Sequence, residues 1–343
     1  MKQVQPFADK LLLPTIPVGF LDDVIQAPRY RGIDITTILS EQGLTEALLK
    51  TSGMRVSVEK YSHVLRALRD ATDDAFLGFL SRPIPADAFR VFCYSLPGCR
   101  TVEELIAQCN DFYGLFIDEF RWTLTDTESA LTIQIDLQET YPIDYRFIIT
   151  SLMLMTIRLF GWLLGEDVEP ELVKFTFTEN TTDKNLTYLF GRGIAYGAER
   201  NLIVFKRRYS KAKLSCTRDQ IREMLKSTRN LFLISRRKYP LSQEVRRLLL
   251  SSKHDEWLEV DEVAQSLGIN PHQLWRKLKA EGSSFLEIRD QIKRDWALVL
   301  LEDPSTSVEM VANQLRYSEA SAFRKAFKKW TGLQPLQYRE LLS

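Results

Sequence analysis

Two short stretches of the chain, residues 271–279 and 321–328, place polar side chains along one face of a predicted helix. Within each stretch these side chains follow the spacing i, i+3, i+4 and i+7, which keeps them on a single helix face. Apolar residues occupy positions i and i+4 on the opposite face of each helix. We call the two polar rows the first and the second stripe. Their members are His272, Trp275, Arg276 and Lys279 in the first stripe, and Ser321, Arg324, Lys325 and Lys328 in the second.

The residue types in the stripes suit the chemistry of duplex DNA. Lysine and arginine neutralise phosphates, and arginine also pairs with the edge of guanine. Gln273, beside the first stripe, either reads an adenine edge or is simply solvated. Trp275 either contacts a sugar or a thymine methyl group, or turns into the core. A single basic stripe is more often a solvated helix face, so it is the second copy at the same spacing that favours DNA binding.

Catalysis and metal binding find little support in the sequence. The three histidines are scattered, and the four cysteines form no C-x-x-C pair, which argues against a zinc site or a disulfide framework. The chain also lacks the G-x-S-x-G motif of serine hydrolases and the lysine of a phosphate-binding loop. The sequence therefore predicts no enzyme, no catalytic residue, no metal and no cofactor.

Each stripe belongs to the second helix of a repeated two-helix unit. The lead helices match at an offset of 48 residues and the second helices at an offset of 49, so the second turn is one residue longer. The small residues Ala264 and Ala312 stand where the two helices of a unit must cross closely. Asn270 is a favourable N-cap, and Pro271 suits the first helical position. A longer helix, predicted over Phe285–Leu301, joins the two units.

The residues after the second turn complete a recognisable pattern. Residues 318–339 read SEASAFRKAFKKWTGLQPLQYR, and Gly-Ser-Ser-Phe follows the first stripe at 282–285. Over about residues 240–343 the chain closely resembles the DNA-binding domain of AraC/XylS-type transcription regulators. That resemblance implies two helix-turn-helix motifs that enter successive major-groove segments about 34 Å apart. The family usually has Gly-Phe where this chain has Arg316-Tyr317. A glycine there would allow a positive φ, which arginine tolerates poorly.

The charge of the chain divides it into three parts. The net charge of +1 is ordinary, but its distribution is uneven. Residues 1–205 hold 19 lysines and arginines against 28 acids (19 − 28 = −9), residues 206–247 hold 14 against 3 (14 − 3 = +11), and residues 248–343 hold 13 against 14 (13 − 14 = −1). A basic segment between two larger parts indicates an interdomain connection. We predict an effector-sensing and dimerisation domain at 1–215, a partly helical basic linker at 216–240, and a DNA-binding domain at 241–343.

The first domain is predicted to be α+β. Alternating or β-branched runs at 120–124 and 130–137 indicate a hairpin, and 172–177 and 201–205 read as further strands. The apolar run 147–164 contains Arg158 and several hydroxyl groups, so we interpret it as a buried core helix rather than a membrane span. The predicted fold is mostly α overall. It combines an α+β N-terminal domain, with a small mixed or antiparallel sheet, and an all-α C-terminal domain with two helix-turn-helix units joined by a long helix.

The N-terminal part lacks the jelly-roll pattern of an arabinose sensor and looks more like the effector domain of the ornithine-regulator and VirS-like branch of the family. That resemblance implies a small-molecule effector and help in dimerisation. The side chains considered for an effector pocket are Tyr94, Tyr113, Arg146 and Trp162, although core packing and surface pairing are the favoured interpretation of each.

These observations predict a cytoplasmic, sequence-specific transcription regulator, with no membrane contact. Its expected partners are promoter DNA, RNA polymerase and a second copy of the chain. The alternative is a sensory or interaction protein that acts mainly through a protein partner of its N-terminal domain. Because the first stripe is chemically mixed and the second nearly all basic, we expect the first to contribute more to base choice and the second more to phosphate affinity.

Overall fold

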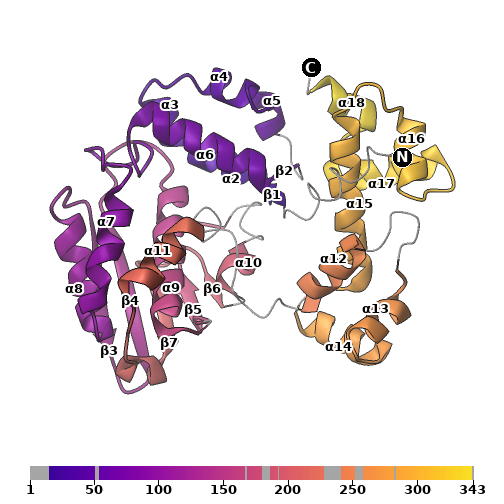
Figure 1. Cartoon of the computed structure of the whole chain (residues 1–343). Helices are drawn as coiled ribbons and strands as arrows, with labels where there is room; N and C mark the ends of the chain where they lie inside the picture. The colour runs from indigo at the N-terminus through magenta and orange to yellow at the C-terminus, as the bar shows by residue number, and fades with distance from the viewer. Residues whose placement is uncertain are drawn as a thin grey trace. The chain divides into compact units, whose positions relative to one another are not determined.

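The computed structural model describes residues 15–50, 54–166, 168–179, 186–191, 193–227, 241–251, 258–281 and 283–341 (Figure 1). The protein is mostly helical, with a small sheet in its N-terminal half and helices throughout the described residues from 241 onward, which confirms the predicted fold class. Two compact units divide the chain. The N-terminal unit comprises the described residues of 19–42 and 62–235. The C-terminal unit comprises those of 1–18, 43–61 and 236–343.

The N-terminal unit is built on a five-stranded sheet. The predicted hairpin is present, and its second strand turns Leu131, Ile133 and Ile135 into the core with at most 1% of each side chain exposed. All neighbouring strands are antiparallel except β5 and β6, so the sheet is mixed, as predicted. In spatial order the strands are β3 (Phe120–Asp126), β4 (Ala130–Leu137), β7 (Asn201–Lys206), β5 (Leu172–Lys174) and β6 (Ile194–Ala195).

The long helix α9 (Arg146–Leu164) is the core helix of this unit. It packs on β4, and the Trp122 indole N–H of β3 donates to Thr156 Oγ1 at 3.0 Å. By length and mean hydropathy (1.9) α9 could cross a membrane, yet 56% of its apolar window is buried inside the structure. A helix that is apolar on all sides is typical of such a buried position. The helix ends at Gly165, whose φ of 69° is left-handed.

Shorter helices surround this core. Helix α8 packs on β3, α7 packs on α8, and α11 packs on α7. The bounds are α2 (Gly19–Val24), α3 (Gln26–Tyr30), α4 (Ile35–Ser40), α7 (Ala88–Ser95), α8 (Val102–Tyr113), α10 (Leu186–Phe190) and α11 (Arg218–Ser227).

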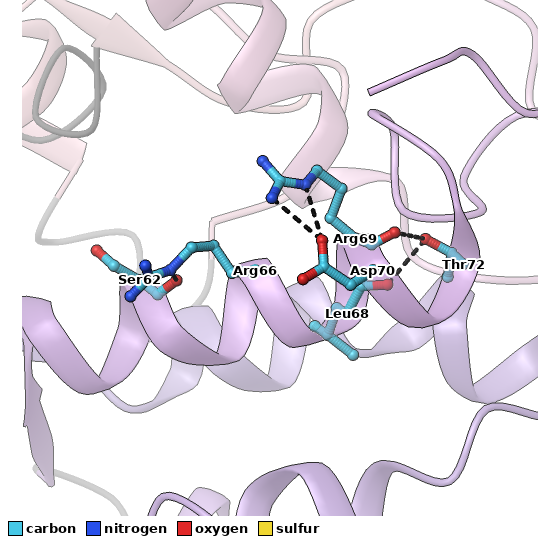
Figure 2. Close-up of polar contacts among 6 residues, drawn as sticks. All are labelled: Ser62, Arg66, Leu68, Arg69, Asp70 and Thr72. Atoms are coloured by element: carbon cyan, nitrogen blue, oxygen red, sulfur yellow. Dashed lines mark hydrogen bonds and ion pairs between the residues drawn. The ribbon is translucent and has the colours of Figure 1, made fainter. Parts of the chain in front are cut away.

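Helix α6 (Val58–Thr72) has a buried face anchored by Val64 and Leu68, both fully buried. Three of its polar side chains contact their own helix, as Figure 2 shows. The contacts join Arg66 Nε to Ser62 O at 3.3 Å, Arg69 to Asp70 at 3.1 Å, and the Thr72 hydroxyl to Leu68 O at 2.8 Å. The helix ends before Asp73, which has a φ of 47°. Exposed pairs of this kind contribute little stability, so α6 is held mainly by its apolar face.

The C-terminal unit contains both two-helix units, which lean on one long helix, α15. Apolar residues of α12, α13 and α14 form a core with Ile288 and Ile292 of α15, while α16, α17 and α18 also pack on α15. The bounds are α12 (Leu241–Ser251), α13 (Val260–Ser266), α14 (Pro271–Ala280), α15 (Phe285–Leu301), α16 (Val308–Gln314), α17 (Ala320–Thr331) and α18 (Pro335–Glu340). The predicted joining helix therefore matches α15.

Short segments from the start of the chain also belong to the C-terminal unit. Strand β1 (Thr15–Pro17) pairs with β2 (Arg55–Ser57), and α5 (Glu46–Leu49) lies between them in sequence. The Thr45 hydroxyl donates to Leu341 O at 3.0 Å, and Lys60 Nζ lies 3.0 Å from Glu302 Oε1. The compact units thus differ from the predicted division of the chain at residues 215 and 240, because these contacts group residues 15–18 and 43–61 with the C-terminal helices. The functional roles assigned to 1–215 and 241–343 stay predictions.

A carboxylate is buried at the centre of the C-terminal unit. Asp295 of α15 has 2% of its surface exposed and accepts hydrogen bonds from Arg246 of α12, at 2.5 Å, and from Arg294, at 3.0 Å. Burial alone would raise the pKa of the Asp295 carboxyl, but Arg294 and Arg246 more than offset it and hold this pKa below its usual value. The ion pairs therefore fix α12 against α15 with the carboxylate charged.

The lead helices of the two helix-turn-helix units end with the same backbone geometry, although the second turn is one residue longer. In the first, Ile269 N–H donates to Ala264 O at 3.0 Å, and in the second Tyr317 N–H donates to Ala312 O at 2.9 Å. This bond is typical of a helix end that requires a left-handed residue. Gly268 supplies that residue in the first turn, with a φ of 65°, and Arg316 in the second, with a φ of 58°. The sequence-based concern about Arg316 is therefore resolved: it adopts the positive φ without changing the turn.

We expect Gly268→Ala to destabilise the C-terminal unit by about 1 kcal/mol, because a left-handed conformation costs any residue with a Cβ. An added Cβ would meet nothing within 4 Å, so the effect reports the backbone alone. Arg316→Gly should stabilise the protein, by less than about 1 kcal/mol, since the greater freedom of glycine in the unfolded chain offsets part of the relief. Urea unfolding of both variants measures this. Equal stability of wild type and Gly268→Ala would contradict it.

Candidate DNA interface

The first stripe lies on the exposed face of α14. Its anchors Leu274 and Leu278 are buried, with 0% and 1% exposed, and they pack on α12, α13 and α15. Because they occupy one side of the helix, the four stripe residues are forced onto the other, and all four are exposed. The start of α14 is held by a capping box, in which the Asn270 side chain accepts from Gln273 N–H at 2.8 Å and Gln273 Oε1 accepts from Asn270 N–H at 3.2 Å.

This capping box affects the predicted role of Gln273. Its amide oxygen accepts one hydrogen bond at the helix start, which uses one of the two lone pairs of that oxygen. Pairing with adenine uses both the oxygen and the nitrogen of the amide. Gln273 therefore contributes to the position of α14 in this structure, and an adenine contact would share its amide oxygen with the cap.

Trp275 projects from the first stripe rather than into the core, with 54% of its surface exposed. Lys279 Nζ lies 4.8 Å from the centre of its ring, and the His272 ring centroid is 6.2 Å away. The exposed ring therefore presents an apolar surface next to basic side chains. Of the two interpretations of Trp275 open from the sequence, the structure selects the exposed one.

The second stripe lies on α17 and has the same construction. Phe323 and Phe327 are fully buried, 5.7 Å apart between ring centroids, and Phe327 packs on Tyr338 of α18. The four stripe residues are exposed. Two of them already contact acids, since Arg324 Nη2 donates to Glu309 Oε1 at 2.7 Å and the Ser321 hydroxyl donates to Glu319 Oε2 at 2.9 Å.

Two basic residues outside the stripes, Arg339 and Lys293, make contacts within the C-terminal unit. Arg339 of α18 donates to the backbone oxygens of Leu301, Asp303 and Thr306, at distances of 3.2, 3.3 and 2.6 Å. Its guanidinium therefore ties α18 to the loop between α15 and α16. Lys293 of α15 lies 4.7 Å from the ring centre of Tyr317, and burial, with Arg289 adding to it, lowers the pKa of Lys293.

Two of the four residues predicted to line an effector pocket lie far apart on one helix. Arg146 begins α9 and Trp162 stands 16 residues later on the same helix, which separates them by about 24 Å along its axis. Arg146 is buried, donates to Thr178 O at 3.0 Å and lies over the Phe177 ring at 4.1 Å. Tyr113 packs within an aromatic cluster, where burial raises its pKa. Tyr94, on α7, is half-buried.

An effector pocket lined by Tyr94, Tyr113, Arg146 and Trp162 stays a prediction, with Arg146 and Trp162 at opposite ends of α9. Sequence reasoning selected polar aromatic residues and an arginine in an apolar setting. Here those features arise from core packing for Tyr113 and from backbone capping for Arg146.

The remaining candidate groups are thiols and the basic linker. Cys93, Cys99, Cys109 and Cys216 are all buried free cysteines, and burial raises the pKa of each thiol, to about 12 for Cys93. Raised pKa values make thiols poor nucleophiles. Within the described part of the chain, no group of three or more metal-binding side chains is present. Helix α11 occupies the first half of the predicted linker 216–240, and residues 228–240 lie outside the described residues.

The Asp295 ion pairs and the Arg324–Glu309 pair were missed from the sequence. A signal existed for Asp295, which stands three residues after the core residue Ile292 and so continues the apolar row of α15. An acid in such a row indicates a buried partner. No comparable signal identifies Glu309, because it joins Arg324 across two helices.

Comparison with known proteins provides the family. The sequence pattern of the arabinose-binding domain of AraC transcription regulators matches residues 32–214, and that of a helix-turn-helix domain matches residues 263–341. The first match alone covers more than half of the chain.

Several curated proteins are similar along the chain. An uncharacterised helix-turn-helix-type transcriptional regulator of Mycobacterium tuberculosis is 24% identical over 318 residues, which cover 90% of this chain and 91% of that protein. The ornithine utilization regulator of Pseudomonas aeruginosa is 20% identical and covers 99% of both chains. The transcriptional regulator VqsM of the same organism is 33% identical over 92 residues, 27% of this chain and 28% of its own.

We expect Trp275→Ala to weaken DNA binding about tenfold, the loss of roughly 1.4 kcal/mol of contact, without changing stability by more than ~0.5 kcal/mol. Its neighbour Leu274 provides the control, because Leu274→Ala empties a fully buried site and should destabilise the unit by about 2–5 kcal/mol. Fluorescence anisotropy with promoter DNA and urea unfolding measure the two effects. A Trp275→Ala protein that unfolds as easily as Leu274→Ala would place Trp275 in the core.

Proposed function

The chain belongs to the AraC family of transcription regulators, and we propose that it binds specific promoter sequences through α14 and α17 in response to a small-molecule effector. The helix-turn-helix domain makes DNA the partner of the C-terminal unit. Base readout assigned to individual stripe residues, and control of that readout by the effector, are the proposed parts.

One observation carries the proposal. Two helices of similar construction, α14 and α17, each bury their apolar anchors and expose a stripe of the same spacing, and both units pack on α15. A helix presented in this way fits the major groove. Because α15 is a continuous helix, the two stripes are held by a common rigid element.

The N-terminal part is proposed to bind the effector and to mediate homodimerisation. Its match to the arabinose-binding domain supports an effector-binding role. One relative is named for ornithine utilization, so amino acids are a reasonable first class of ligand. Contact with RNA polymerase and a cytoplasmic location complete the proposal, as expected of a regulator that acts on promoters. Residues 216–240 would then connect the two functional parts.

The DNA-binding proposal predicts that Arg276→Ala and Lys325→Ala each weaken specific binding, by about 1–3 kcal/mol where a base contact is lost. Lys277→Ala is the matched control, because Lys277 is an exposed lysine of α14 that lies outside the stripe. A gel-shift titration on the native promoter at moderate salt measures all three. If the stripe variants bind and footprint like wild type, the stripes are not the DNA interface.

The effector proposal is tested by a thermal-shift screen of amino acids, fatty acids and other small metabolites on the full-length protein. A true effector should raise the melting temperature, since a ligand that binds only the folded state stabilises it by mass action. It should also change promoter affinity, because it must bind one arrangement of the protein better than another. A ligand that is turned over would instead identify an enzyme, and a protein partner captured in place of any ligand would favour an interaction protein.

A further inference from the structure

The Arg324–Glu309 pair distinguishes the second helix-turn-helix unit from the first. Arg324 belongs to the stripe of α17, and Glu309 projects from the lead helix α16. Their side chains are 47% and 59% exposed, so the pair stands at the protein surface beside Lys325 and Lys328. Neither lysine forms an ion pair within the part of the chain that the structure describes.

The backbones that carry the pair are held firmly. The Ser307 side chain caps α16 by accepting from Met310 N–H at 3.1 Å, one residue beyond Glu309. Phe323, which precedes Arg324, is fully buried. The distance of 2.7 Å between Arg324 Nη2 and Glu309 Oε1 is therefore a contact between two fixed helices rather than between two free loops.

The first unit has no equivalent pair. At the offsets that relate the two units, Glu309 corresponds to Asp261 and Arg324 corresponds to Trp275. Trp275 instead contacts Lys279. The ion pair is thus a feature of the second helix-turn-helix unit alone.

A paired arginine is better suited to a base than to a phosphate. The carboxylate offsets the positive charge and repels the DNA backbone, so Arg324 loses much of its attraction for phosphate. Its guanidinium keeps N–H donors that the bond to Glu309 does not use. A carboxylate that fixes the plane of the guanidinium also reduces the entropy lost when two parallel hydrogen bonds form.

We propose that Glu309 orients Arg324 to read a guanine in the major groove contacted by α17. Guanine presents two acceptors there, O6 and N7, whose spacing matches two N–H groups of arginine. Glu309 acts as a positioning residue and Arg324 as the reader, while Lys325 and Lys328 supply the phosphate contacts. This inference rests on the proposed function, and it reverses the expectation that the second stripe contributes mainly phosphate affinity.

The test compares base preference in full-length wild type with that in Glu309→Gln, Arg324→Lys and Lys328→Ala. Selection from a randomised DNA library identifies the preferred site, and titration of that site and its single guanine-to-adenine variants gives the discrimination. Wild type should prefer guanine about tenfold or more at one position of the second half-site. Arg324→Lys keeps the charge but lacks the planar fork, so its preference should fall to within about threefold. Glu309→Gln should reduce the same guanine preference several-fold and leave the preferences at all other positions unchanged.

Two controls separate positioning from charge. Lys328→Ala should weaken binding to all sequences and reduce the slope of log K against log salt by about 1, whereas Arg324→Lys should leave the slope unchanged. Asp219→Asn removes the acid of another exposed arginine pair, Arg222–Asp219 at 2.9 Å on α11, and should change neither slope nor preference.

Three results would overturn the inference. If Glu309→Gln tightens binding to every sequence equally, the carboxylate only repels DNA. If Glu309→Gln weakens binding to every sequence equally and lowers the melting temperature of the protein, the pair is structural. If Arg324→Lys retains the guanine preference, another residue reads that base. A wild-type protein that selects no sequence at all would instead contradict the proposed function, and the inference with it.

Discussion

The C-terminal unit depends on a charged group placed where an apolar one would be expected. Asp295 continues the buried row of α15, and its carboxylate is satisfied by Arg246 from α12 and by Arg294 from its own helix. A buried ion pair is seldom more stabilising than well-packed apolar residues, but it tolerates only one arrangement of its partners. Slippage of α12 along α15 would remove Arg246 from a buried carboxylate and leave it with Arg294 of its own helix. Since α14 packs on α12 and α15, the same constraint fixes how the first stripe is presented.

The two helix-turn-helix units show how one backbone plan supports different surface chemistry. Their turns share a left-handed residue and a cross-turn hydrogen bond, although one uses Gly268 and the other Arg316. Their buried anchors are leucines in one and phenylalanines in the other. Outside these constraints the units diverge, with an exposed indole in the first stripe and an ion pair in the second. Duplication of a fold thus preserves what packing requires and leaves the exposed face free to change.

Much of the fold was predictable because it depends on local signals. The α14 cap at Asn270 and the β3–β4 hairpin follow from residue types and periodicity within a few positions. The effector pocket could not be assigned from the sequence, because polar aromatics and arginines occupy cores and caps as readily as ligand sites, and only their spatial positions distinguish the two. The Arg324–Glu309 pair was unpredictable for a related reason: its partners are 15 residues apart, and the turn between their helices determines whether they meet.

The grouping of β1, α5 and β2 with the C-terminal helices has a consequence for how this protein can be divided. A fragment beginning at residue 241 would lack Thr45 and Lys60, and so would lose the contacts that they make to Leu341 and Glu302. The compact unit that contains both helix-turn-helix units is therefore not contiguous in the sequence. The hydrogen bond from Thr45 to Leu341 joins residues 296 positions apart, so two distant segments of the sequence contribute to one compact unit.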